Sequence, residues 1–171
     1  MKVGIVFGCF IPLHVGHVSL IKKALNENDK VIIGVCGFDG DRGKDFVPFR
    51  DRINLMTKRY GKNPKVVLSV VDDKKIGLTG KFDTISWVYW SSELFTNANF
   101  DPDDEKNTYT WYTGEENYVS ELSLIFPKHK FNLIDRQICK VSGTQIRNNP
   151  NEFKDDIIPI YQEYLKEHDK L

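Results

Sequence analysis

The chain has 171 residues, which suits one domain that buries about two-thirds of its unfolded surface and leaves no room for a second catalytic domain. Lys plus Arg and Asp plus Glu both number 24, so there is no net basic field to attract nucleic acid or an anionic membrane, and any phosphate site must be local. Three cysteines without metal spacing, in a chain with no secretory leader and no run of ~18 apolar residues, predict a soluble, cytoplasmic protein with free thiols.

Five short runs rich in apolar and β-branched residues are predicted to be strands. Each is nearly continuously apolar, a pattern typical of strands that are buried on both faces of a parallel sheet. The runs cover residues 2–8, 30–37, 65–72, 108–114 and 130–135.

Patterns typical of helices lie between and after these strands. They cover residues 15–28, 49–61, 83–95 and 115–126, then a short segment at 142–150 and a C-terminal pattern at 151–168. The polar stretch 97–107 is predicted to be a surface loop. Pro159 lies inside the last pattern and is expected to divide it into two pieces.

The alternation of strand and helix predicts one α/β domain. Residues 1–140 form a Rossmann-like, doubly wound sheet of five parallel strands, and residues 141–171 add C-terminal helices. Ligands of such sheets bind beyond the carboxyl ends of the strands, where the strand order reverses. The first strand delivers His14 and His17 to that place.

The loop "FGCFIPLHVGH", residues 7–17, has the features of a phosphate site. Gly8 ends the strand, Pro12 fixes the loop, and Gly16 lets backbone N–H groups approach an anion at the positive end of the following helix. His14 and His17, at i and i+3, place two imidazole donors on one side of the same turn. The combination favours a polyphosphate and the stabilisation of charge that develops during phosphoryl displacement.

Two other interpretations of the histidine pair stay open. A zinc site needs a third ligand, and the remaining histidines, His129 and His168, lie in a loop and near the C-terminus. The other interpretation is that the two histidines have a purely structural role.

A second motif, "VSGTQIRNNP" at residues 141–150, follows the fifth strand. Ser142 can cap a short helix, and Thr144 and Arg147 are three residues apart, so a hydroxyl and a guanidinium can face one anion. Alone, the motif is equally typical of a capped helix with a surface arginine.

Taken together, these two motifs resemble those of the nucleotidylyltransferase (HxGH) superfamily, and most closely the nicotinamide mononucleotide (NMN) adenylyltransferase domain of NadR-type proteins. The resemblance covers nearly the whole chain and is carried by "FGCFIPLHVGH", "RDRINLM", "WVYWS" and "DRQICKVSGTQIR". It implies transfer of the adenylyl group of ATP to NMN, which yields NAD and pyrophosphate. Nicotinate mononucleotide or phosphopantetheine as acceptor, and a non-catalytic module that senses NAD or ATP, remain alternatives.

The resemblance also implies roles for individual residues. The catalytic set is His14, His17 and Arg147. The ATP-binding set is Gly8, Cys9, Phe10, Gly16, Ser142, Thr144 and Arg147. The NMN-binding set is Phe10, Trp87, Trp90 and Gly114. No carboxylate cluster predicts a protein-held metal, so Mg²⁺ is expected to arrive with ATP.

The two tryptophans are at i and i+3 of a predicted helix, on one face. A flat indole suits the pyridinium ring of NMN, worth ~0.5–2 kcal/mol. Packing in the core is the competing interpretation of aromatic residues at this spacing. The oligomeric state is left open, with a homo-oligomer as one option.

Cys9 departs from the pattern that the resemblance implies, in which this position is Lys or Arg in close relatives and Ser or Thr in others. A nearby Lys, Arg42 or Arg147 then has to carry more of the phosphate neutralisation, and a Cys9 thiol of low pKa would make the site sensitive to thiol reagents. Arg50 and Arg52 open a predicted helix, and their side chains either contact phosphate or pair with Asp51 and solvent. "GLTGKF", residues 77–82, lacks the spacing of a Walker motif and is predicted to be a loop.

Overall fold

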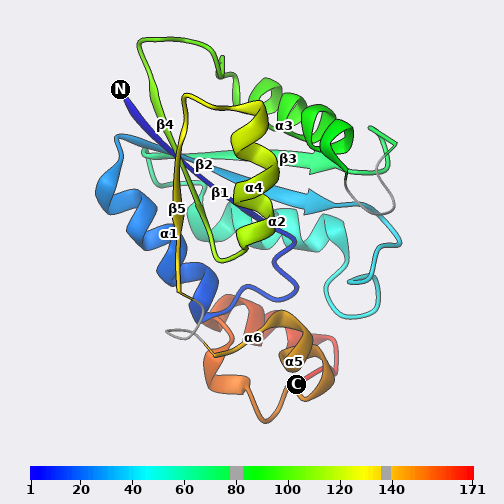
Figure 1. The fold of residues 1–171 in the computed structure, drawn as a ribbon. Helices are drawn as coiled ribbons and strands as arrows, with labels where there is room; N and C mark the ends of the chain where they lie inside the picture. The colour runs from blue at the N-terminus through cyan, green and yellow to red at the C-terminus, as the bar shows by residue number, and fades with distance from the viewer. Residues whose placement is uncertain (78–82, 136–139) are drawn as a thin grey trace.

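The computed structural model describes residues 1–77, 83–135 and 140–171 (Figure 1). Its core is a parallel sheet of five strands in the order β3-β2-β1-β4-β5. The strands are β1 (Lys2–Gly8), β2 (Lys30–Gly37), β3 (Val66–Asp72), β4 (Thr108–Thr113) and β5 (Lys130–Leu133). This confirms the predicted doubly wound, Rossmann-like α/β class. The expected loop at 77–82 and the thiol of Cys139 fall largely or wholly outside the described residues.

The helices also follow the predicted order. They are α1 (Val15–Glu27), α2 (Phe49–Tyr60), α3 (Thr84–Ala98), α4 (Glu116–Ile125), α5 (Gly143–Asn148) and α6 (Pro159–Glu167). Pro159 is the first residue of α6, and a 3₁₀ turn at Lys154–Asp156 precedes it, so the C-terminal pattern is divided as expected. Helix α3 is longer than predicted: it runs to Ala98, so the first two residues of the predicted loop at 97–107 are helical, and it is capped by Asn99, whose φ of 57° is in the left-handed region.

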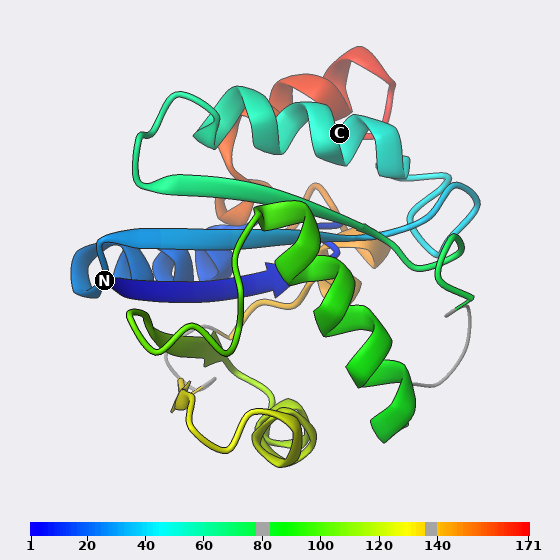
Figure 2. The ribbon, with the colours of Figure 1, turned by 90° about the horizontal axis from the view of Figure 1, so that it is seen from above.

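The helices cover the two faces of the sheet in separate groups. In Figure 2, α2 and α6 lie on one face, and α3 and α4 lie on the other. The first group packs, with α1, on a core that includes Val6, Ile33 and Met56, and the second packs on a core that includes Ile5, Ile32 and Trp90. Alternate residues of the central strands therefore supply the two cores.

Burial on both faces holds for the central strands β1 and β2 but not for the whole sheet. At the edge, Lys130 and Leu133 at the ends of β5 are exposed, and β3 has several half-buried residues. The prediction of five doubly buried strands was wrong at these edges, because an edge strand has a neighbour on one side only.

Strand order reverses at β1, which lies between β2 and β4. The C-terminal segment braces the loop that leaves this strand: the Ile158 N–H donates to the Leu13 carbonyl at 3.3 Å, and His14 forms a bridge with Ile157. The division of the chain into a core and C-terminal helices stays a prediction. Within the described ranges, no helix combines the length and apolarity needed to cross a membrane.

Candidate active site

A cavity of about 950 Å³ opens at the carboxyl ends of the strands. All twelve residues that the sequence predicts for the site line it: Gly8, Cys9, Phe10, His14, Gly16, His17, Trp87, Trp90, Gly114, Ser142, Thr144 and Arg147. They come from segments that are up to 139 residues apart in the chain, from Gly8 to Arg147. The fold therefore gathers the predicted set at the expected edge of the sheet, while their individual contacts with ligands stay predictions.

The two histidines cap the helix that carries them. Nδ1 of His14 accepts a hydrogen bond from the Gly16 N–H at 3.2 Å, and Nδ1 of His17 accepts one from the His14 N–H at 3.5 Å. The ring centroids are 3.8 Å apart. Because Nδ1 is the acceptor in both rings, a neutral ring carries its proton on Nε2, which is the donor nitrogen of that ring. The capping bonds therefore hold both rings in a fixed orientation at the cavity.

Phe10 packs against the histidine pair. Its φ of 50° is in the left-handed region, which is uncommon for a residue with a side chain. Its ring is 1% exposed and packs edge-on against His17, with centroids 5.1 Å apart. The Phe10 ring is therefore a packing partner of His17, and its contacts with ATP and NMN stay predictions.

Arg147 joins the second motif to the first. Its Nη1 donates to the Ile11 carbonyl at 2.7 Å, and its Nη2 donates to Thr144 Oγ1 at 3.1 Å. Ser142 caps α5 as predicted, because its Oγ accepts from the Gln145 N–H at 3.2 Å.

Gly143 makes this contact between the two motifs sterically feasible. A Cβ at this position would lie 2.9 Å from the Ile11 carbonyl oxygen and 3.2 Å from Nη1 of Arg147. The sequence reasoning did not single out Gly143, although its place inside the second motif was a signal.

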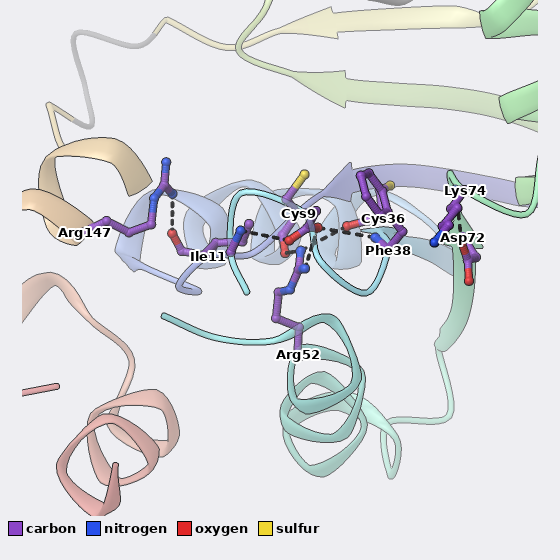
Figure 3. A network of polar contacts seen from close by, with 10 residues as sticks. Cys9, Ile11, Cys36, Phe38, Arg52, Asp72, Lys74 and Arg147 are labelled. Carbon is purple, nitrogen blue, oxygen red and sulfur yellow. Dashed lines mark hydrogen bonds and ion pairs between the residues drawn. The ribbon is translucent and has the colours of Figure 1, made fainter. Parts of the chain in front are cut away.

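Arg52 has a role that differs from both sequence hypotheses. The side chain is fully buried, and Figure 3 shows it pointing from α2 toward the ends of β1 and β2. Its Nη1 donates to the carbonyls of Cys9 and Cys36 at 3.1 and 3.3 Å, and its Nη2 pairs with Asp41. The buried guanidinium therefore fixes the floor of the cavity.

The sequence contained a signal for this burial. Arg52 follows Phe49 by three residues and precedes Met56 by four, and both of these are buried on the same face of α2. Asp51, the expected partner, instead accepts a hydrogen bond from Tyr164 at 2.5 Å.

Cys9 is half-buried, and burial raises the pKa of its thiol above the ordinary value. The nearby guanidinium groups of Arg42 and Arg52 lower this pKa, but by less than burial raises it. The hypothesis of a low-pKa thiol at this position was therefore wrong. Arg42 is exposed and lines the cavity, so Arg42 and Arg147 are cations that border it.

The other end of the cavity is aromatic. Trp87 and Trp90 are only 6% and 2% exposed, so they pack in the core as the competing interpretation held, yet both line the cavity. The ring of Phe7 lies 4.7 Å from that of Trp90, and the ring of Tyr118 lies 5.1 Å from that of Trp87. Tyr118 also lines the cavity and was not among the predicted residues.

Two known proteins of similar sequence have names that refer to NAD metabolism. The chain is 30% identical over 170 residues to the "Trifunctional NAD biosynthesis/regulator protein NadR" of Escherichia coli, an alignment that covers 86% of this chain and 37% of that protein. It is 28% identical over 121 residues to a "Probable nicotinate-nucleotide adenylyltransferase" of Aliarcobacter butzleri, which covers 68% of this chain and 65% of the relative.

Solved structures agree with these matches. NadR in complex with NR has a TM-score of 0.78, and NadR in complex with NAD and AMP-PNP has one of 0.73, both at 29% identity. The matches cover 96% and 94% of this chain but 45% of each NadR chain, so this chain spans less than half of the NadR proteins it matches. The profile of the cytidylyltransferase-like family matches residues 5–149. The chain therefore belongs to the cytidylyltransferase-like family of nucleotidyltransferase enzymes.

Proposed function

We propose that this chain transfers the adenylyl group of ATP to nicotinamide mononucleotide, which yields NAD and pyrophosphate. The observation that carries the proposal is the single cavity that joins a capped histidine pair, a braced arginine and an aromatic wall. The names of the E. coli relative and of the NadR structure with NAD and AMP-PNP support the same chemistry.

The reaction needs positioning and charge stabilisation rather than a protein nucleophile. A 5′-phosphate oxygen of NMN, ionised at neutral pH, attacks the α-phosphorus of ATP in line, and the bond to the bridging oxygen of pyrophosphate breaks. Nε2–H groups of His14 and His17 donate to oxygens around the α-phosphorus, where charge develops. Arg147, with Ser142 and Thr144, holds the β- and γ-phosphates of the leaving group.

Mg²⁺ reaches the site bound to the phosphates of ATP in this proposal. In ranges 1–77, 83–135 and 140–171, no group of three or more His, Cys, Asp or Glu is placed to hold a metal ion, so we assign it no protein cage. On ATP, the ion supplies positive charge to the phosphate oxygens. The roles assigned to the protein side chains do not depend on a protein ligand to it.

NMN is favoured over other acceptors by the aromatic wall, because an indole face attracts the pyridinium cation of the nicotinamide ring. Nicotinate mononucleotide is the second candidate, and the name of the A. butzleri relative favours it. A module that senses NAD or ATP without turnover is the candidate from another class, and Cys9, which lines the cavity without supplying a positive charge, favours that one.

The deciding experiment incubates the purified protein with ATP, Mg²⁺ and each acceptor in turn: NMN, nicotinate mononucleotide and phosphopantetheine. Pyrophosphate release and the mass of the product are followed together. We expect NAD from NMN at the highest rate. Binding of ATP or NAD without pyrophosphate release from any acceptor would support the sensing module, and Cys9→Lys would then test whether a missing cation explains the loss of turnover.

A further inference from the structure

At the aromatic end of the cavity, one carboxylate has a buried oxygen that accepts no hydrogen bond from the described residues. Asp73 directly follows β3 and lines the cavity together with Trp87 and Trp90. Its Oδ1 is buried and, among the described residues, no group donates a hydrogen bond to it. A buried polar atom without a partner is costly, so its place in a ligand cavity calls for a functional explanation.

The pleat of β3 places Asp73 on the face of the tryptophans. Val71 and Ser69, two and four residues earlier, are on this face: Val71 packs in the cluster that contains Trp87, and the Ser69 hydroxyl donates to the Leu94 carbonyl of α3 at 2.8 Å. The Asp73 N–H donates to the Gly37 carbonyl at 3.0 Å, which ties the residue to the end of β2.

Asp72 belongs to the opposite face and has partners. Its Oδ1 accepts hydrogen bonds from the N–H groups of Lys74 and Lys75, each at 3.1 Å, and Figure 3 shows the contact with Lys74. Asp72 lines a different hollow, together with Phe49 and Arg50. The two adjacent carboxylates are therefore a matched pair, one facing the aromatic end of the site and one facing away.

The charges around Asp73 leave it without full compensation. Arg52 is the cation that acts on it, but that guanidinium already pairs with Asp41 and donates to two carbonyls. Burial, followed by the negative charges of Asp72 and Asp41, raises the pKa of Asp73 to about 7. A cationic ligand would supply the charge that is missing here.

We infer that Asp73 selects the acceptor nucleotide, by favouring the cationic, amide-bearing nicotinamide ring over a nicotinate ring. The nicotinamide ring has a net positive charge, which the negative charge of a carboxylate that lines the same cavity attracts. A nicotinate ring carries a carboxylate that cancels this charge and repels a second carboxylate. The inference rests on the proposed function and adds its source of specificity.

The test compares Asp73→Asn with Asp72→Asn and with the unchanged protein. kcat/KM is measured for NMN and for nicotinate mononucleotide, and the quenching of tryptophan fluorescence by each nucleotide gives its Kd. We expect Asp73→Asn to lower the NMN to nicotinate mononucleotide ratio about tenfold, the effect of about 1.4 kcal/mol. Asp72→Asn removes a charge that raises the pKa of Asp73 but leaves the Asp73 carboxylate in place, so it should not lower the ratio. The Asn side chain removes an uncompensated charge, so we expect Asp73→Asn to fold.

Failure of the inference and failure of the proposed function give different results. If the unchanged protein makes NAD but Asp73→Asn keeps the same ratio, the role of Asp73 is wrong and the enzyme assignment stands. If the unchanged protein releases no pyrophosphate with either acceptor, the proposed function is wrong, and the ratio of the two Kd values still tests Asp73. Equal Kd ratios in both proteins would overturn the inference.

Discussion

The two ends of the cavity are built in opposite ways. At the phosphate end, polar side chains are held by the protein itself: the histidines cap α1, and Arg147 is braced by Ile11 and Thr144. At the aromatic end, packed rings line the cavity together with Asp73, which has a buried oxygen without a partner among the described residues. The phosphate end is therefore ordered before a ligand arrives, whereas the aromatic end holds a charge that a ligand has to compensate.

The largest effect is expected at the phosphate end. His17→Ala removes a donor that its capping bond orients, so we expect kcat to fall roughly 10²–10³-fold, as for loss of one pre-organised oxyanion donor. The lost cap costs about 0.5–2 kcal/mol of unfolding free energy, so the variant should still fold. Steady-state kinetics with ATP and NMN, beside thermal unfolding, measures both quantities.

His168→Ala is the matched control for this change. His168 is an exposed residue at the end of α6 that stacks on Tyr164 and does not line the cavity. We expect its kcat to be that of the unchanged protein. A near-normal kcat for His17→Ala would remove the histidine from the catalytic set.

Arg147→Lys is expected to have the next largest effect. The guanidinium can contact the Ile11 carbonyl, Thr144 and a phosphate at once, and an ammonium group cannot reproduce that planar fork. Hydrogen bonds to charged groups are worth about 1.5–3 kcal/mol, so kcat/KM for ATP should fall about 10- to 100-fold. Arg50→Lys, at an exposed position of α2, is the control, and an equal loss in both variants would contradict the assignment.

The features that the sequence predicted well are those that depend on nearby residues. Strand and helix order follows from hydrophobic periodicity, and the Ser142 cap and the Thr144–Arg147 contact join residues at most three positions apart. The convergence of the two motifs followed from the topology of a doubly wound sheet.

The features that the sequence did not predict depend on distant contacts. The hydrogen-bond partners of Arg52 are the carbonyls of Cys9 and Cys36, which the fold brings to this residue from the ends of β1 and β2. The raised pKa of the Cys9 thiol depends on burial by the whole site rather than on its neighbours in the chain. The unpartnered oxygen of Asp73 depends on which face of β3 meets α3.

At the aromatic end, Trp87→Leu tests whether the wall binds the acceptor. Loss of a cation–π contact worth ~0.5–2 kcal/mol should raise KM for NMN about tenfold, with KM for ATP unchanged. Tyr89→Leu is the control, because Tyr89 is on α3 as well but is 60% exposed. If KM for NMN stays constant while only the unfolding free energy falls, the tryptophan is a core residue and nothing more.

The smallest effect is on stability and its dependence on pH. The pKa of Asp73 is about 7 in the folded protein against an ordinary value of 3.8, so the folded state binds this proton more tightly than the unfolded state. Stability is therefore lost as pH rises from about 4 to 7, and the loss is complete above pH 7.

Asp73→Asn lacks this loss of stability. Its unfolding free energy should match that of the unchanged protein at pH 4 and exceed it at pH 8 by about 1–2 kcal/mol, since solvent screening reduces the full linkage value. Urea unfolding at the two pH values measures the difference, and an equal difference at both would mean that Asp73 does not titrate in this window. Saturating NMN should reduce the difference in unfolding free energy between the two proteins at pH 8, because the positive nicotinamide ring would compensate the charge of Asp73.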